Sequence, residues 1–314
     1  MPWSTTDVPD LADRVAVVTG ANSGLGLETT RELARRGAHV LMAVRDGARA
    51  EAASADVEAS VPEASLELVP LDLADLGSVT DAARRLTTDH PRIDLLVANA
   101  GVMATPERRT QDGFELQVGI NHLGHFALVA QLMPSLARAV AARVVTVTST
   151  GRHLGRVLDP RDPWREGRYD PWRAYGDSKL ANLLFAVELD VRLRAAGARV
   201  ASLAAHPGLS ATELQASSVH ASGGGRTQRL AQRLAHGTGS APELAVLPQL
   251  RAATDPDADG GQLYAPRFVN VGPPVRRPLL ARSRSRRAGR RSWRVSELQT
   301  GLRFDVAETV ALAS

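Results

Sequence analysis

The sequence has no cysteine, and this absence excludes several kinds of chemistry. Without thiols the chain forms no disulfide, no thiolate nucleophile and no cysteine-ligated zinc site. A chain without cysteine is compatible with a reducing compartment, so we expect a cytoplasmic protein. No apolar run approaches the roughly 18 residues of a membrane span, and the N-terminal stretch MPWSTTDVPDLADR has no apolar segment. We therefore expect neither a membrane span nor a secretion signal.

Lysine is nearly absent as well, because among 38 lysine and arginine residues only Lys179 is a lysine. The arginines gather in one place: nine lie between Arg276 and Arg294, a stretch without any acidic residue. Outside it acidic residues outnumber basic ones, so the net charge of +4 does not describe the whole chain. The stretch could contact nucleic acid or an acidic membrane surface. We favour an exposed, partly helical surface segment and expect neither partner.

The 314 residues, 44% of them hydrophobic, suffice for a large buried core. Short apolar runs rich in β-branched residues alternate with stretches of helical periodicity, which indicates a parallel sheet covered by helices. The expected strands are 14–20, 39–45, 66–73, 93–101, 142–149, 199–208 and 260–266. This pattern predicts an α/β fold, a Rossmann-type doubly wound parallel sheet of about seven strands with helices on both faces, in a single domain.

Two stretches interrupt this alternation. An insert at 151–172 is rich in Pro, Asp and Trp, and a Gly- and Ser-rich stretch at 209–243 resembles a substrate lid. We expect both to border the site, because they follow strand ends. The predicted organisation is an N-terminal extension at 1–13, the domain at 14–275 and the basic C-terminal segment at 276–314.

The stretch TGANSGLG (19–26) follows the first predicted strand and opens the first predicted helix. Its glycines, Gly20, Gly24 and Gly26, allow a tight turn, a close approach to a pyrophosphate and close packing of helix on strand. The spacing G-x-x-x-G-x-G differs from the general fingerprint G-x-G-x-x-G. A glycine-rich turn alone is weak evidence, but the flanking strand and helix indicate a dinucleotide site.

The second predicted strand ends at Arg45. In this fold an acidic residue at that place binds the ribose 2′-hydroxyl of NAD, whereas an arginine accommodates the 2′-phosphate of NADP. Arg45 therefore favours NADP(H) over NAD(H). Two alternatives stay open: Asp46 faces the ribose if the turn differs by one residue, or Arg45 is an ordinary surface arginine.

Tyr175 and Lys179 are four residues apart, so on a helix they share one face. A tyrosine with its usual pKa of about 10 is a poor base at neutral pH, but a nearby cation lowers that pKa. A phenol tuned in this way can exchange a proton with a substrate oxygen while hydride moves at carbon. Lysine suits this role better than arginine, because its charge is compact and carries three donors.

Seven short motifs are spread along nearly the whole chain, in this order: TGANSGLG, LDLADL, NAG, INHLGHF, VTST, YGDSK and HPG. With them the chain resembles the short-chain dehydrogenase/reductase family, most closely its retinol-dehydrogenase-like and protochlorophyllide-reductase-like branch. The resemblance implies Tyr175 as general acid/base, with Lys179 orienting the nicotinamide ribose and depressing the tyrosine pKa. It implies Ser149 as the group that binds the substrate oxygen, and Asn121 as part of a proton relay through water.

The resemblance also assigns the cofactor contacts. Asp72 would bond the adenine, Asn99 would stabilise the sheet beside the cofactor, and Pro207, Gly208 and Thr212 would hold the carboxamide. The full set expected at the cofactor is Gly20, Asn22, Ser23, Gly24, Leu25, Gly26, Arg45, Asp72, Leu73, Asn99, Ala100, Gly101, Tyr175, Lys179, Pro207, Gly208 and Thr212.

The function these residues imply is an NADP-preferring short-chain alcohol dehydrogenase or carbonyl reductase. The alternative is a non-catalytic NADP-binding sensor, which the full set of reacting groups disfavours. We expect an apolar alcohol, aldehyde or ketone as substrate, and a homodimer stays open. The apolar candidates for the lining of the substrate pocket are Trp164, Trp172, Leu209 and Leu214. No metal is expected, because His122, His125, His153 and His206 lack the spacing of a metal site.

Overall fold

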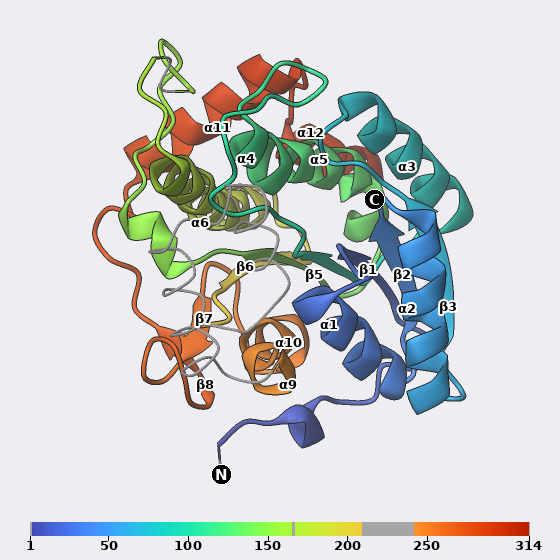
Figure 1. Cartoon of the computed structure of the whole chain (residues 1–314). Helices are drawn as coiled ribbons and strands as arrows, with labels where there is room; N and C mark the ends of the chain where they lie inside the picture. Colours follow the sequence, from blue (N-terminus) through green and yellow to red (C-terminus); the bar gives the residue numbers. More distant parts are fainter. Residues whose placement is uncertain (1, 165–166, 209–241, 314) are drawn as a thin grey trace.

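The computed structural model describes residues 2–164, 167–208 and 242–313 (Figure 1). Its sheet has eight strands in the order β3-β2-β1-β4-β5-β6-β7-β8. The strands are β1 (Val15–Thr19), β2 (His39–Val44), β3 (Ser65–Pro70), β4 (Leu95–Ala98), β5 (Ala142–Val147), β6 (Val200–Ala205), β7 (Leu263–Pro266) and β8 (Pro274–Arg277). All neighbours are parallel except β7 and β8. The chain changes direction across the sheet between β1 and β4, where ligands of such sheets bind.

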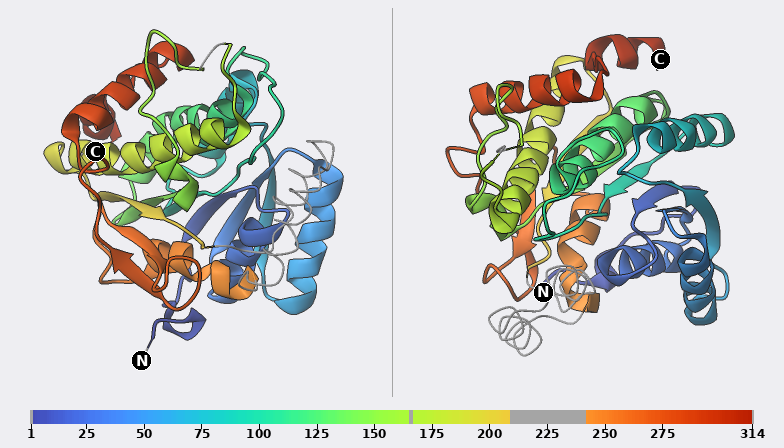
Figure 2. Two further views of the ribbon diagram at one scale, coloured as in Figure 1. Left: turned by 60° about the vertical axis from the view of Figure 1, so that its left-hand side comes forward. Right: turned by 45° about the horizontal axis from the view of Figure 1, so that its top comes forward.

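Helices cover both faces of the sheet (Figures 1 and 2). The α-helices are α1 (Gly24–Arg35), α2 (Gly47–Ser60), α3 (Leu76–Asp89), α4 (Leu116–Val118), α5 (Gly124–Ala137), α6 (Pro171–Ala195), α9 (Pro242–Ala245), α10 (Leu247–Thr254), α11 (Arg286–Thr300) and α12 (Val306–Ala313). Shorter turns are η1 (Thr5–Asp7), η2 (Gly119–Leu123) and η3 (Thr150–His153).

Side chains of successive strand residues point to opposite faces, and this alternation divides the core. In β1, Ala16 and Val18 pack with α1, α2 and α9, whereas Val17 packs with α3 and α5. All three are fully buried. The predicted doubly wound α/β domain is confirmed, with its seven strands in place.

The eighth strand, β8, is an addition that the sequence did not predict. It begins at a proline, contains two arginines and lies at the sheet edge, paired antiparallel with β7. Edge strands tolerate proline and charge because one side of their backbone faces solvent. The strand therefore needs no apolar run, and the sequence pattern does not predict it.

The segment after β8 folds back onto the domain. Helix α11 lies along α6 and α12 lies along α5 (Figure 2). Trp293 is 3% exposed and its ring stacks on those of Phe185 and Phe304, at centroid distances of 5.6 and 5.0 Å. The expected helix is present, but only its arginine-bearing face is exposed.

The insert 151–172 packs against the start of α6. The backbone N–H of Arg156 donates to Asp177 at 2.6 Å, and the Tyr169 hydroxyl donates to the Thr105 carbonyl at 2.8 Å. The predicted lid lies outside the described residues up to residue 241. Among the helices that the structure describes, none is long and apolar enough to span a membrane.

Candidate active site

The glycine-rich turn joins the end of β1 to the start of α1. Gly20 and Gly24 have φ of +65° and +51°, a region that favours glycine. A Cβ on Gly26 would lie only 2.1 Å from the Gly20 carbonyl oxygen. The N-cap Ser23 gives no side-chain bond to the helix, so its first N–H groups are available to an anion.

A cavity of about 520 Å³ opens at the carboxyl ends of β1, β2 and β4, beside this turn. Eleven of the predicted cofactor residues line it: Gly20, Asn22, Ser23, Gly24, Leu25, Arg45, Asp72, Leu73, Asn99, Ala100 and Gly101. Gly26 acts by close packing behind the turn. The position and the lining residues of the cavity therefore suit a dinucleotide.

Three charged side chains, Arg45, Asp46 and Arg49, line the end of the cavity beside β2. Asp46 is the N-cap of α2, and its carboxylate accepts the backbone N–H of Arg49 at 3.2 Å. The Arg49 guanidinium lies 3.8 Å from the same carboxylate. Arg49 was missed in the sequence, because a helix-start arginine next to a capping aspartate is typical of any surface helix.

Asp72 and Asn99 are fixed by bonds to backbone groups. One Asp72 carboxylate oxygen accepts the N–H of Ala74 at 2.9 Å, and among the described residues no side chain or backbone group bonds its other oxygen. The Asn99 amide donates to the Thr19 carbonyl at 2.9 Å, which ties the end of β4 to the end of β1.

Tyr175 and Lys179 lie one turn apart on α6, and Ser149 stands at the end of β5 as the N-cap of η3. A Cβ on Gly151 would lie 2.8 Å from Tyr175 Cε1 and 3.6 Å from Ser149 Oγ, so both side chains lie beside Gly151. Burial raises the pKa of Tyr175, and the Ser149 hydroxyl only partly offsets the rise. In the chain alone desolvation of the phenol dominates, so the net lowering of this pKa expected from the sequence is not found there. The role of Lys179 beside a bound cofactor stays a prediction.

Lys179 is 5% exposed, and its Nζ donates to the Val147 carbonyl at 3.1 Å. The same nitrogen lies 5.8 Å from the centroid of the Tyr175 ring. Burial lowers the pKa of Lys179 to about 8. An anion or hydroxyl that entered the site would therefore change the pKa of Lys179.

Asn121 lies in η2, a π-helical turn between α4 and α5, rather than in a regular helix. Its Oδ1 accepts the N–H of Val102 at 2.7 Å, and its Nδ2 donates to the Val102 carbonyl and to Ser178 Oγ, both at 2.9 Å. A Cβ on Gly101 would lie 2.9 Å from Asn121 Oδ1 and 3.5 Å from Lys179 Nζ. Because Gly101 also lines the cavity, the cavity lies next to Asn121 and Lys179.

His125 supports this arrangement and was assigned no role from the sequence. Its Nδ1 lies 3.0 Å from the Asn121 carbonyl, and its Nε2 lies 2.8 Å from Thr19 Oγ1. The Thr19 hydroxyl in turn accepts the N–H groups of Asn99 and Ala100, each at 3.0 Å. The one available signal was the spacing of four from Asn121 to His125 within NHLGH.

The remaining predicted cofactor residues follow β6. Gly208 has φ of +85°, and a Cβ on it would lie 2.3 Å from the Asn270 carbonyl oxygen. Pro207 and Gly208 are not among the residues that line the cavity. Thr212 lies outside the described residues.

The sequence model of the short chain dehydrogenase family matches residues 14–223. The chain belongs to this family. A short-chain dehydrogenase is an oxidoreductase with an NAD(P)-binding Rossmann fold, which agrees with the sheet order and with the cavity described above.

Among the relatives of this short-chain dehydrogenase, retinol dehydrogenase 12 of Mus musculus is 42% identical over 210 residues, which cover 67% of this chain and 65% of the relative. Retinol dehydrogenase 13 of Homo sapiens is 39% identical over 201 residues, covering 64% and 60%. The match thus spans less than two thirds of the length of these curated relatives.

Two solved structures extend the comparison. An uncharacterized protein from Mycobacterium Paratuberculosis has a TM-score of 0.79 at 41% identity, covering 97% of this chain and 99% of that one. A protein from Beutenbergia cavernae, described as an NAD(P) dependent gluconate 5-dehydrogenase with NADP bound at low occupancy, has a TM-score of 0.63 at 28% identity. It covers 81% of this chain and 95% of that one.

Proposed function

We propose that this short-chain dehydrogenase interconverts an apolar alcohol and its aldehyde or ketone, prefers NADP(H), and uses Tyr175 as general acid/base. The observation that carries the proposal is the placement of Ser149 and Tyr175 beside Gly151, with Lys179 one helical turn from Tyr175. Gly101 connects this group to the cavity, because it lines the cavity and packs against Asn121 and Lys179.

The glycine turn and the cavity suit a dinucleotide, whose phosphates would meet the N–H groups of α1. Asp72 would hold the adenine and Lys179 the nicotinamide ribose. The bound nicotinamide would supply or accept the hydride. The chain's own residues would orient the substrate and move one proton.

In the direction of reduction, Ser149 would bind the carbonyl oxygen of the substrate and Tyr175 would give it a proton. The phenol O–H bond breaks and the alcohol O–H bond forms, which leaves a phenolate on Tyr175. Because burial raises the pKa of Tyr175, the phenol stays protonated at neutral pH and is ready to donate. The Ser149 hydroxyl and the Lys179 ammonium would stabilise the phenolate that forms.

The cofactor preference follows from the charges beside β2. Arg45 and Arg49 bring two guanidinium groups to the cavity, whereas the Asp46 carboxylate is engaged at the start of α2. A 2′-phosphate would meet two cations there, and guanidinium groups bind phosphate through charge-assisted bonds. The NADP bound to the Beutenbergia cavernae protein is consistent with this preference.

An apolar substrate is supported by Trp172, which lies on α6 before Tyr175 and is 47% exposed. Its ring meets that of Tyr175 edge-on at 6.4 Å. The similarity to retinol dehydrogenases supports the same substrate class. Trp164, also a candidate for the pocket, packs against Phe114 instead, and Leu209 and Leu214 lie outside the described residues.

The test is a panel of apolar aldehydes and ketones assayed with NADPH and NADH side by side, and of apolar alcohols assayed with NADP and NAD. We expect NADPH oxidation with at least one carbonyl compound, and a lower KM for NADPH than for NADH. Arg45→Ala should raise the KM for NADPH about tenfold or more, the effect of losing one bond to a charged group, and leave that for NADH unchanged. Arg84→Ala, an exposed arginine on α3, is the matched control.

Two results would contradict the proposal. If no compound on the panel oxidises NADPH or reduces NADP, the chain is a sensor rather than an enzyme. If Arg45→Ala affects both cofactors equally, the preference does not come from a 2′-phosphate contact.

A further inference from the structure

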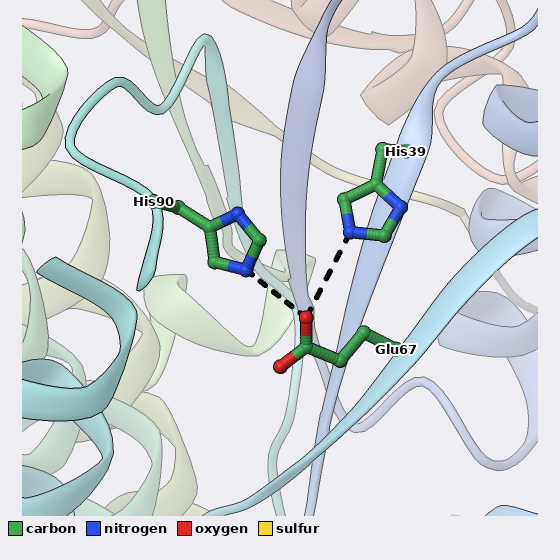
Figure 3. Close-up of side chains that lie close together, drawn as sticks. All are labelled: His39, Glu67 and His90. Carbon is green, nitrogen blue, oxygen red and sulfur yellow. Dashed lines mark hydrogen bonds and ion pairs between the residues drawn. The ribbon is translucent and has the colours of Figure 1, made fainter. Parts of the chain in front are cut away.

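Two histidines and a glutamate meet at the opposite end of the sheet from the cofactor cavity (Figure 3). His39 is the first residue of β2, Glu67 lies in β3, and His90 follows the last residue of α3. The strands pair with His39 beside Ser65 and Leu41 beside Glu67, so the His39 and Glu67 side chains share one face of the sheet. Three elements far apart in the sequence therefore contribute one side chain each.

The distances among their ligand atoms are close to those of a metal site. His90 Nε2 lies 3.0 Å and His39 Nε2 lies 3.8 Å from the same oxygen, Glu67 Oε2, and the three ligand atoms lie within 4.8 Å of one another. A tetrahedral zinc ion with bonds of about 2.0–2.2 Å keeps its ligands roughly 3.4 Å apart. Small side-chain rotations would bring all three atoms to that spacing.

In two of the three residues, the polar atom that does not face the proposed metal already has a partner within hydrogen-bond distance. His39 Nδ1 lies 2.7 Å from Ser65 Oγ, and with the proton on Nδ1 the lone pair of Nε2 is left for a metal. Arg85 donates to Glu67 Oε1 at 2.8 Å, so Oε2 is the oxygen that faces both imidazoles. Metal ligands commonly have such outer partners, which fix their orientation.

The charges are also compatible with a divalent cation. Arg85 donates a charge-assisted hydrogen bond to Glu67 at 2.8 Å, which suits an ionised carboxylate. The charge of Arg85 is partly balanced by Asp89, whose carboxylate lies 3.7 Å from its guanidinium.

We propose that His39, Glu67 and His90 bind one Zn²⁺ ion, with water in the fourth position. Two imidazoles and a carboxylate suit zinc, a borderline ion, better than calcium or magnesium, which prefer all-oxygen sites. The side chains are 33%, 27% and 16% exposed, so water and the ion can reach the site. This proposal departs from the prediction of no metal, which was argued from other histidines. The members of this cluster have no recognisable spacing in the sequence.

The ion would join the edge strand β3 to β2 and to the end of α3. Its role is structural, because the cofactor cavity lies at the carboxyl ends of the strands and His39 stands at an amino end. Zinc would stabilise the folded chain by mass action, since the unfolded chain does not hold the three ligands together.

The experiment uses the full chain, freed of metal with a chelator and then titrated with ZnCl₂ by calorimetry. We expect one ion per chain and a Tm that rises with zinc. Singly, His39→Gln, Glu67→Gln and His90→Gln should each weaken zinc binding about 100-fold or more, whereas Ser65→Ala, which removes an outer partner, should cost about tenfold. His153→Gln, a histidine outside the cluster, should bind zinc as the wild type does.

Co²⁺ in place of zinc provides a second readout, because its visible spectrum reports tetrahedral coordination in the unmutated chain. It also keeps the test decisive if a ligand variant fails to fold. The proposal is overturned if zinc does not bind, if Co²⁺ shows no tetrahedral spectrum, or if the folded ligand variants bind zinc as tightly as His153→Gln.

Discussion

Lys179 occupies a position where the size of the cation matters. Its ammonium is buried, donates to the Val147 carbonyl, and would lie 3.5 Å from a Cβ placed on Gly101. An arginine carries its charge on a broad planar fork, which does not fit between the β5 backbone and Gly101 without displacing one of them. This explains why a chain that otherwise uses arginine for its basic side chains has a lysine here.

We predict that Lys179→Arg lowers kcat about 100-fold, because the phenolate of Tyr175 and the ribose both lose a compact donor. Steady-state rates with NADPH measure the effect, and the Tm shows whether the variant folds. Arg84→Lys, the reverse exchange at an exposed site, should leave the rate unchanged. A folded Lys179→Arg variant with near wild-type turnover would show that the lysine is incidental.

Single residues were predictable from sequence where the chemistry depends on local spacing. The glycine turn, Arg45 and the pair Tyr175 and Lys179 are of this kind, and the structure puts the turn and Arg45 at the cavity. The direction in which the pKa of Tyr175 shifts was not predictable, because burial of the phenol depends on the packing of the whole site.

At the scale of elements, the departures from sequence expectation come from tertiary contacts. The π-helical turn η2 widens the helix at Asn121, and such turns are common at functional sites. The sequence pattern does not predict this π-helical turn, because the residues around it have the periodicity of a regular helix. The Asn121 carbonyl in this turn lies 3.0 Å from His125 Nδ1, and the other nitrogen of that ring lies 2.8 Å from Thr19 Oγ1.

The C-terminal helix is a second element that composition described poorly. Its many arginines suggested a surface segment, but Trp293 and Val295 are buried. Arg192 of α6 stacks on the Trp293 ring at 4.2 Å, and Arg291 of α11 pairs with Asp159 of the insert at 2.5 Å. Arg291 thus makes an ion pair within the chain itself, while the expectation of neither nucleic acid nor membrane as a partner stays a prediction.

At the scale of the whole molecule, three buried histidines limit stability in acid. Burial lowers the pKa of His122 to about 4 and those of His125 and His206 to about 3, from an ordinary value of 6.5. Between these values and 6.5 the unfolded chain binds more protons than the folded one. Stability is therefore present above pH 6.5 and is lost as the pH falls below it.

We predict that the free energy of unfolding falls by roughly 2 kcal/mol for each of the three histidines between pH 7 and pH 5. Urea unfolding at the two pH values measures the loss, which amounts to a large part of the stability of an ordinary domain. In His122→Gln the loss should be smaller by about one histidine's share. Equal stability of the wild type at pH 7 and pH 5 would contradict this account.

The two ends of the sheet divide the molecule's proposed activities, with dinucleotide chemistry at the carboxyl ends of the strands and zinc binding at the amino ends. The central claim concerns the first of these: Tyr175 moves the proton that accompanies hydride transfer.

The most direct measurement is NADPH-dependent turnover of Tyr175→Phe, together with its affinity for NADPH. The phenylalanine keeps the ring packed and removes only the hydroxyl. We predict a kcat at least about 100-fold below that of the wild type, with an unchanged Kd for NADPH. A Tyr175→Phe variant that turns over at the wild-type rate would contradict the proposed mechanism.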